Sequence, residues 1–178
     1  MSEAGYGVAL LDDCKYGHDL HRGALRLTLL KAANYPDPDA DRGDHRFTYS
    51  LFPHAGDPIE GDVVGEAARL NHPVVSMPGS GAEVSMLSAV AVTDPAVVIT
   101  AVKRAEDGSG DIIVRCYESA GGRCSTTMTT AFETSSLTVC DLLERTLDEE
   151  AGAATLDGGE IRIRLRPFQI LTVRLSAR

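Results

Sequence analysis

The sequence predicts an all-β fold, a large antiparallel β-sandwich with one short helix. Apolar and polar residues alternate along many short stretches, which is the period of a strand with one row of side chains on a core. Turn-forming residues, chiefly glycine and aspartate, separate these stretches. One segment combines helix-capping residues with helical spacing of its apolar residues. The length of 178 residues suits a single domain over residues 1–178.

Three strands are predicted in the N-terminal part of the chain. An apolar run at residues 7–11 ends at Asp12 and Asp13, and strand-like alternation resumes at residues 25–30 and 46–51. Because successive side chains of a strand point to opposite faces, the apolar row of the third stretch is expected to face the core. That row consists of Phe47, Tyr49 and Leu51.

One helix is predicted from residue 57 onward. Asp57 suits the N-cap, Pro58 the first helical position and Glu60 the reciprocal capping position. Asn71 and Pro73 end the helix. Two glycines inside it weaken it by roughly 1 kcal/mol each relative to alanine, so it is expected to pack on a sheet. The face available for that packing is formed by Val63, Ala67 and Leu70.

The C-terminal half begins with a predicted hairpin. Residues 97–102 are apolar on both rows, which is typical of a central strand that is covered on both faces. The turn sequence at residues 107–110 joins this strand to a second one at residues 112–117. A threonine-rich strand is expected at residues 124–132.

Two strands with strict alternation are predicted near the C-terminus, on either side of Pro167. The first has its apolar row at Ile161, Ile163 and Leu165. The second has it at Leu171, Val173 and Leu175. Surface loops are expected at residues 77–82 and 147–159.

Charge and composition exclude several classes of function. The net charge of −9 disfavours binding to nucleic acid, which needs an excess of lysine and arginine to neutralise phosphates. The same charge disfavours an anionic membrane surface, and no apolar run reaches the roughly 20 residues of a membrane span. We therefore expect neither a nucleic-acid nor a membrane partner.

The four cysteines are scattered, and no two form a CxxC pair. Three of them lie inside strand-like runs, where cysteine usually serves as a small buried apolar residue. Reduced thiols and a cytoplasmic location are the preferred interpretation. A bridge between Cys116 and Cys124 across a hairpin remains an open alternative.

Residues that could carry chemistry cluster after the first strand, but simple interpretations fail there. Asp12 and Asp13 are adjacent in a strand, so they point to opposite faces and cannot flank one glycosidic bond. We expect one of them to cap the turn and the other to be solvated. Nearby side chains suggest a metal site, yet they form one short turn without the second cluster that structural zinc requires. They are Cys14, His18, Asp19 and His21.

Other binding motifs are weak. Residues 37–41 resemble the opening of a calcium loop, but Arg42 and Thr48 stand where glycine and glutamate are needed. Sugar-binding modules commonly stack hexose rings on exposed tryptophan, and this chain has none. An independent carbohydrate-binding or protein-interaction β-sandwich is therefore the alternative rather than the preferred function.

Three segments, in order along the chain, resemble the C-terminal β region of glycoside hydrolase family 38 α-mannosidases, of the bacterial class II type. The first is GVALLDDCKYGHD at residues 7–19, where the family has asparagine or aspartate at the position of Asp12. The second spans residues 35–54, and the third is LRPFQI at residues 165–170. The resemblance implies a supersandwich-like β-domain.

The resemblance also implies that catalysis takes place in a separate domain. The family hydrolyses terminal α-linked mannose with retention, using an aspartate nucleophile and a divalent metal, typically zinc, in a catalytic domain upstream of the region that this chain resembles. This fragment is therefore expected to be inactive alone and to need no cofactor. Its expected partners are its own catalytic domain and a mannose-containing oligosaccharide. A homo-oligomer of the isolated fragment is left as an open alternative.

The candidate site is the segment after the first strand, called here the site loop: Asp13, Lys15, Tyr16, Gly17, His18 and Asp19, with Cys14 between them. Lys15 offers a compact cation, and Tyr16 an aromatic face with a hydroxyl. Gly17 is expected to permit the turn and Asp13 to fix it through backbone N–H groups. The loop is expected to line the substrate cleft or, as the alternative, only to contact the catalytic domain.

Overall fold

The computed structural model describes residues 1–76, 78 and 88–177, and contacts within the chain divide it into two compact units, Met1–Pro78 and Gly79–Arg178. Both units are built from antiparallel strands. The described residues contain one α-helix, so the predicted all-β sandwich with a short helix is confirmed. The single domain over residues 1–178 stays a prediction. The predicted loop at residues 77–82 lies, except for Pro78, outside the described residues.

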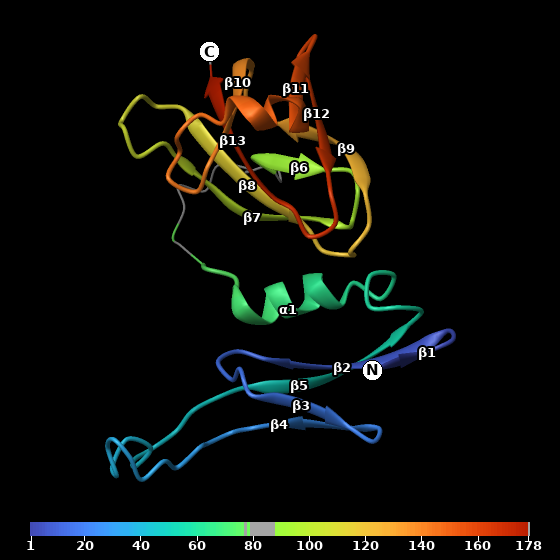
Figure 1. Cartoon of the computed structure of the whole chain (residues 1–178), viewed down its shortest axis with the longest axis vertical. Helices are drawn as coiled ribbons and strands as arrows, with labels where there is room; N and C mark the ends of the chain where they lie inside the picture. Colours follow the sequence, from blue (N-terminus) through green and yellow to red (C-terminus); the bar gives the residue numbers. More distant parts are fainter. Residues whose placement is uncertain (77, 79–87, 178) are drawn as a thin grey trace. The chain divides into compact units, whose positions relative to one another are not determined.

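The first unit contains a three-stranded sheet, a separate hairpin and the helix (Figure 1). The sheet has the order β1-β2-β5, and the hairpin pairs β3 with β4. The strands are β1 (Ser2–Glu3), β2 (Tyr6–Asp12), β3 (His18–His21), β4 (Ala24–Leu27) and β5 (Tyr49–Ala55). The helix α1 (Val63–Asn71) contacts β2, as its apolar face predicted.

The buried face of this sheet is the one that carries Leu11 and His54. The His54 ring packs directly on the backbone of two glycines. A Cβ atom added to Gly7 or to Gly61 would fall within 2.6 Å of an atom of this ring. The opposite row of β5 is exposed, with Tyr49 at 58% and Leu51 at 68%. The prediction that this row faces the core of the chain is therefore wrong. Alternation in the sequence defines the two rows of side chains, but it does not tell which of the two rows is covered by the helix.

The predicted capping box forms, but the helix begins later than expected. Oδ1 of Asp57 accepts hydrogen bonds from the N–H groups of Ile59 (2.7 Å) and Glu60 (2.9 Å), and Asp57 N–H donates to Glu60 (3.3 Å). These bonds close a turn that precedes α1 and is not part of the helix. Asp62 then has a φ of 51°, a left-handed conformation that interrupts helical hydrogen bonding, so α1 starts at Val63.

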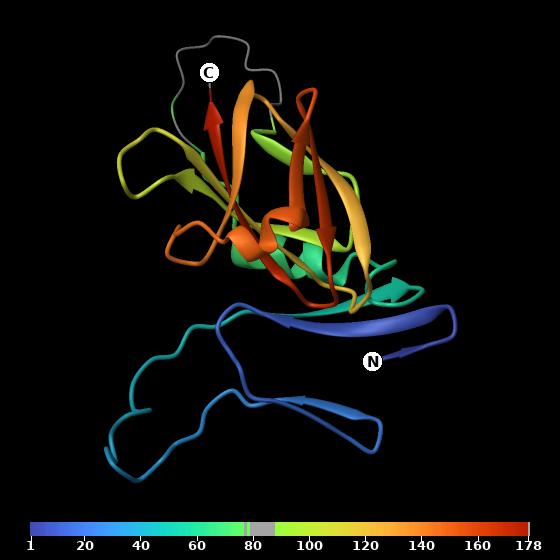
Figure 2. The same ribbon diagram turned by 45° about the horizontal axis from the view of Figure 1, so that its top comes forward.

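The second unit is a sandwich of two four-stranded sheets (Figure 2). One sheet has the order β10-β13-β8-β7 and the other the order β11-β12-β9-β6. The strands are β6 (Val90–Val92), β7 (Val97–Arg104), β8 (Ile112–Glu118), β9 (Cys124–Thr130), β10 (Thr134–Cys140), β11 (Ala154–Asp157), β12 (Glu160–Leu165) and β13 (Ile170–Ala177). A single core fills the space between the sheets, and both predicted apolar rows of β12 and β13 lie in it.

Two predictions for this unit are wrong. Strand β7 is an edge strand rather than a central one, and its Val102 is 43% exposed. Residues 147–159 are not simply a loop, since they contain the 3-10 helix η1 (Asp148–Ala153) and strand β11. Apolar side chains of η1 and β11 pack on the core, a tertiary interaction that no local pattern in the sequence signals.

The cysteines are all free. Strands β8 and β9 belong to different sheets, so the turn between them crosses from one sheet to the other and does not form a hairpin. Burial raises the pKa of the Cys116 thiol to about 12, which keeps it protonated. Among the described residues the α-helix has 9 residues, far fewer than a bilayer crossing requires.

Candidate functional site

The site loop is ordered by Asp12, the last residue of β2. Its Oδ1 accepts hydrogen bonds from the backbone N–H groups of Cys14 (3.2 Å) and Lys15 (2.5 Å). Its Oδ2 lies 3.2 Å from Nε2 of His18. An aspartate that accepts bonds from the backbone two and three residues ahead forms an Asx-type turn. Asp12 therefore caps the turn, as expected of one of the two aspartates, whereas the backbone N–H group that Asp13 binds comes from outside the turn.

Asp13 instead fastens the loop to the segment that leads into β5. Its Oδ1 accepts a bond from Thr48 N–H (2.9 Å), and its own N–H donates to the Thr48 carbonyl (3.2 Å). Hydrogen bonds from the Cys14 thiol and from Thr48 N–H lower the pKa of Asp13 to about 2. The bond to Asp13 also raises the pKa of the Cys14 thiol. At neutral pH the carboxylate is ionised and the thiol is protonated.

Gly17 is required by a close approach rather than by its backbone conformation. Its φ is not positive, so the turn here does not need the left-handed conformation that glycine allows. A Cβ atom at this position would lie 2.9 Å from Cβ of Thr28, and Thr28 N–H donates to the Gly17 carbonyl over 2.8 Å. Any larger residue would push the loop away from the end of β4.

The side chains of Lys15 and Tyr16 differ in their contacts and in their exposure. The Lys15 ammonium lies 4.8 Å from the centre of the Phe47 ring, a cation–π contact, and Phe47 stacks at 6.5 Å on Tyr49. Tyr16 is 96% exposed, so its ring and hydroxyl are presented to the surroundings of the unit. The loop thus displays a free aromatic ring next to a cation that is already positioned.

His18 and Asp19 open β3 and face partners within the unit. His18 lies beside Asp12, and Asp19 forms an ion pair with Arg26 at 2.6 Å on the adjacent strand β4. Within the described part of the chain, no three His, Cys, Asp or Glu side chains gather in a way that could hold a metal ion. The family resemblance assigns its divalent metal to the upstream catalytic domain and not to these residues.

A shallow hollow lies beside the loop, between it and the chain that follows β4. Its rim is rich in donors, because two lysines, a tyrosine and a histidine contribute to it, and Asp41 is the acidic residue among them. Asp41 already accepts a bond from Ala32 N–H (2.5 Å). The lining residues are Cys14, Lys15, Tyr16, Gly17, Thr28, Leu29, Leu30, Lys31, Asp41 and His45. Such a rim suits the hydroxyl groups of a sugar or the carboxylates of another protein surface.

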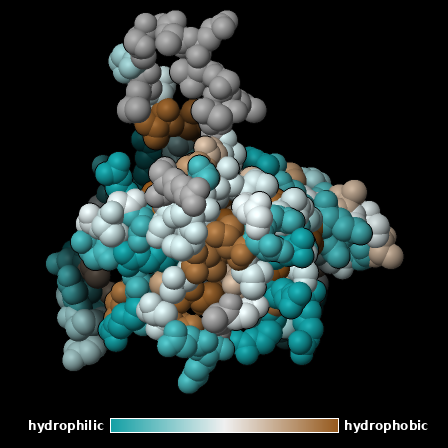
Figure 3. Space-filling view, turned by 90° about the horizontal axis from the view of Figure 1, so that it is seen from above, coloured by the Kyte–Doolittle hydropathy of each residue, from teal (hydrophilic) through white to brown (hydrophobic). Residues whose placement is uncertain are grey.

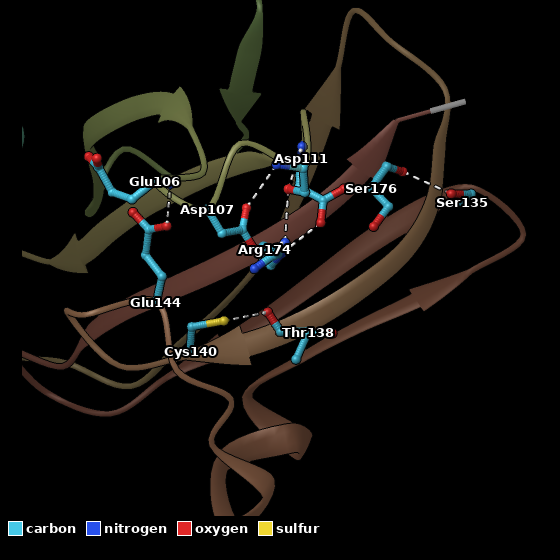
Figure 4. Close-up of polar contacts among 10 residues, drawn as sticks. Glu106, Asp107, Asp111, Ser135, Thr138, Cys140, Glu144, Arg174 and Ser176 are labelled. Atoms are coloured by element: carbon cyan, nitrogen blue, oxygen red, sulfur yellow. Dashed lines mark hydrogen bonds and ion pairs between the residues drawn. The ribbon is translucent and has the colours of Figure 1, made fainter.

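The second unit offers no better acid–base pair among its described residues. On the outside of the β10-β13-β8-β7 sheet, Arg174 binds Asp107 and Asp111, each at 2.6 Å (Figure 4). Lys103 binds Glu144 at 2.9 Å. The Arg174 hydrogen bond lowers the pKa of Asp111, and the Lys103 bond lowers that of Glu144. Carboxylates held ionised in this way cannot donate a proton, so the cluster fastens loops to the sheet.

One end of the sandwich is hollowed where the β11–β12 hairpin turns, and apolar residues lie there among polar ones (Figure 3). Threonine hydroxyls and Glu160 surround the hollow, and Thr127 donates to Glu160 over 3.0 Å. Its aromatic residue, Phe132, packs on the core and is only partly exposed. The hollow therefore lacks a free aromatic face on which a hexose could stack.

Replacing Asp12 by alanine is expected to loosen the site loop, because two backbone N–H groups lose their acceptor. A lost cap of this kind typically costs about 1–2 kcal/mol. Hydrogen exchange of the Cys14 and Lys15 amides should accelerate by roughly tenfold or more. Asp12→Asn is the matched control, because its amide oxygen can still accept both bonds. Unchanged exchange in Asp12→Ala would show that Asp12 does not order the loop.

Two models of one family match the chain in separate segments. The model described as "Glycosyl hydrolases family 38 C-terminal domain" matches residues 1–39, which include β2 and the site loop. The model described as "Glycosyl hydrolases family 38 C-terminal beta sandwich domain" matches residues 96–173, which form most of the second unit.

Relatives and solved structures agree with these matches. Alpha-mannosidase 2C1 of Homo sapiens is 38% identical over 178 residues, which cover 98% of this chain and 17% of the human protein. Alpha-mannosidase of Saccharomyces cerevisiae is 30% identical over 98% of the chain and 18% of its own length. An alpha-mannosidase structure from Enterococcus faecalis superposes with a TM-score of 0.72 at 19% identity, covering 99% of this chain and 20% of that one. At this identity the structural likeness shows the fold. The chain thus spans about a fifth or less of the length of the proteins it matches.

Proposed function

Because this chain belongs to glycoside hydrolase family 38, as a C-terminal domain of an α-mannosidase, we propose that it serves within a longer enzyme that hydrolyses α-linked mannose. In that enzyme it buttresses the catalytic domain and lines one edge of the mannoside-binding cleft. The aspartate nucleophile and the divalent metal, zinc, belong to the catalytic domain. The chain itself contributes binding and support rather than chemistry.

The observation that carries this proposal is the presentation of Tyr16. Tyr16 is 96% exposed, although the loop backbone is fixed on both sides by the bonds to Asp12 and Asp13. An exposed aromatic residue on a rigid loop is positioned for a partner outside the unit, because only a small entropy loss remains when it binds. Lys15 beside it adds a donor for a sugar hydroxyl or for an acidic rim.

The buttressing role is supported by the outer face of the β1-β2-β5 sheet. Tyr49 and Leu51 are exposed on β5, and on the same face of the sheet Tyr6 of β2, which pairs with Ala55 further along β5, is 49% exposed. An apolar sheet face of this kind commonly marks an interface with another domain. We propose the catalytic domain as its partner. In the isolated chain, two copies can cover the same face by dimerising. The four free cysteines, two of which are buried, suit a reducing, cytoplasmic location.

The test is to replace Lys15 and Tyr16 in the complete enzyme. Lys15→Ala and Tyr16→Phe are each expected to lower kcat/KM for an α-mannoside by about tenfold, the effect of losing one good hydrogen bond to substrate. Both side chains are held by few contacts within the chain, so the free energy of unfolding should change by less than roughly 1 kcal/mol.

Tyr35→Phe is the matched control for the tyrosine variant. Tyr35 is 87% exposed in the same unit but lies outside the site loop, so its hydroxyl should be dispensable. If Lys15→Ala and Tyr16→Phe both retain the kinetics of the unmodified enzyme, the loop does not face the substrate, and its role is docking alone.

A further inference from the structure

The hollow beside the site loop brings together the lysines that have no acidic partner. The chain contains three lysines, and Lys103 is paired with Glu106 and Glu144. The other two, Lys15 and Lys31, form no ion pair with any residue that the structure describes, and both line the hollow. In a chain with a net charge of −9, two ammonium groups without a carboxylate partner therefore meet at one place.

Lys15 is held in position by the segment that leads into β5. Its ammonium group lies 4.8 Å from the centre of the Phe47 ring. Phe47 is kept at the loop because the next residue, Thr48, forms two hydrogen bonds with Asp13, at 2.9 and 3.2 Å. An aromatic face attracts a cation without taking the place of a hydrogen-bond acceptor, so the N–H groups of the ammonium remain available to a ligand. The structure thus provides a positioned cation at the edge of the hollow.

The one carboxylate in the lining is already engaged by the backbone. Asp41 accepts a hydrogen bond from Ala32 N–H through Oδ2 (2.5 Å), and its carbonyl oxygen lies 2.8 Å from Nε2 of His45. Two ammonium groups therefore face a single aspartate in the lining, which leaves an excess of positive charge. Like charges repel each other unless an anion lies between them. The lining therefore favours an anionic ligand over a neutral one.

The size of the hollow and its other polar groups indicate which anion fits. Its volume is about 420 Å³, within the range of small-molecule sites, roughly 300–1,000 Å³. A phosphate monoester carries about −1.5 to −2 charges at pH 7 and matches two ammonium groups, whereas a carboxylate carries only one charge. The hydroxyl groups of Tyr16 and Thr28 line the same hollow, and each can donate to and accept from a sugar hydroxyl.

We propose that the hollow beside the site loop binds the phosphate group of a phosphorylated mannoside. Lys15 and Lys31 contact the phosphate, and the hydroxyl groups of Tyr16 and Thr28 contact the sugar. The mannosyl part of this ligand rests on the proposed function. The phosphate goes beyond it, because it gives the substrate an anionic group and makes Lys31 a determinant of specificity. Phe47 is a positioning residue, since it acts through Lys15.

Binding to the 178-residue chain, followed by amide chemical shifts in NMR, tests the proposal with three probes. They are methyl α-mannoside, the same mannoside carrying a phosphate, and inorganic phosphate. The phosphorylated mannoside should bind at least about tenfold more tightly than either of the others, because hydrogen bonds between ionised groups are the stronger ones. Equal binding of the two mannosides would overturn the proposal. Equal binding of inorganic phosphate would overturn it too, since it would indicate an adventitious ion only.

Lys31→Gln tests the anion contact directly. It should weaken binding of the phosphorylated mannoside by about tenfold, the effect of losing one charge-assisted hydrogen bond. Arg22→Gln is the matched control, because it removes the same charge from an exposed residue that does not line the hollow. It should change the affinity by less than about twofold, since distant surface charges are screened. If the two variants weaken binding equally, Lys31 does not contact the phosphate and the proposal is overturned.

Two variants of Phe47 test its positioning role. Phe47→Leu removes the aromatic face below the Lys15 ammonium and should weaken binding of the phosphorylated mannoside by roughly threefold or more, whereas Phe47→Tyr retains that face and should preserve the affinity. Equal affinity of the two variants would contradict this role. These measurements need neither metal nor a catalytic domain. Their failure would remove the phosphate site and leave the proposed function in place, whereas a complete polypeptide that hydrolyses no mannoside would refute the proposed function alone.

Discussion

Replacing Glu118 by alanine is expected to lower the free energy of unfolding of the second unit by about 3–5 kcal/mol. Four backbone N–H groups lose their acceptor in this variant, and the side chain that they surround is 1% exposed. A buried donor without a partner costs about 1–3 kcal/mol, and partial entry of water limits the sum. Urea denaturation followed by circular dichroism measures the change.

The Glu118 effect should depend on pH. Because the folded-state pKa is lowered, the carboxylate contributes stability above the ordinary pKa of glutamate and loses it as the pH falls through the lowered value. The difference between Glu118→Ala and the unmodified chain should therefore be full at pH 7 and smaller at pH 3. Glu118→Gln should be intermediate at pH 7, since one oxygen remains to accept bonds.

Glu149→Ala provides the control for removing a glutamate from the same unit, because Glu149 is exposed. It should change the free energy of unfolding by less than about 0.5 kcal/mol. A Glu118→Ala variant as stable as this control would contradict the view that the buried carboxylate ties the β12–β13 turn, through Phe168 N–H, to the β8–β9 connection, through the N–H groups of residues 120–122.

Some elements could be predicted because their pattern is local and complete. In β12, Ile161, Ile163 and Leu165 are buried, each at 3% exposure or less, as strict alternation predicted. Alternation failed for Tyr49 and Leu51, because the covering of a row is decided by other segments or by a partner. The edge position of β7 could not be predicted from the sequence either, because the order of strands in a sheet depends on long-range contacts.

The site loop could be located from its sequence, but its internal organisation could not. Asp12 and Asp13 are both plausible caps by composition, and only the hydrogen bonds show that Asp12 caps the turn. The glutamate at position 118 gave no signal, because a carboxylate at the end of a strand normally faces water. One clue was present in the sequence: Phe168 follows Pro167 where a type II turn would normally place glycine.

The chain by itself is expected to leave a nitrophenyl α-mannoside unhydrolysed, even with added zinc or cobalt. Retaining hydrolysis requires two carboxylates placed across one bond, about 5 Å apart. Among the described residues, Asp12 and Asp13 both serve the site loop, while Asp107 and Asp111 are bound to Arg174. No described group of side chains could hold the metal either. We therefore expect no hydrolysis by the chain alone.

A longer polypeptide that includes the proposed catalytic domain is expected to hydrolyse the mannoside at least about 10⁴-fold faster than the chain alone. The reason is that enzymatic rate enhancements are commonly 10⁶-fold or larger. Both proteins are assayed at equal concentration, with and without metal, after a second purification that removes contaminating mannosidase. Metal-dependent turnover by the chain alone, persisting through that second purification at constant specific activity, would contradict the supporting role. The catalytic groups would then have to be sought within these 178 residues.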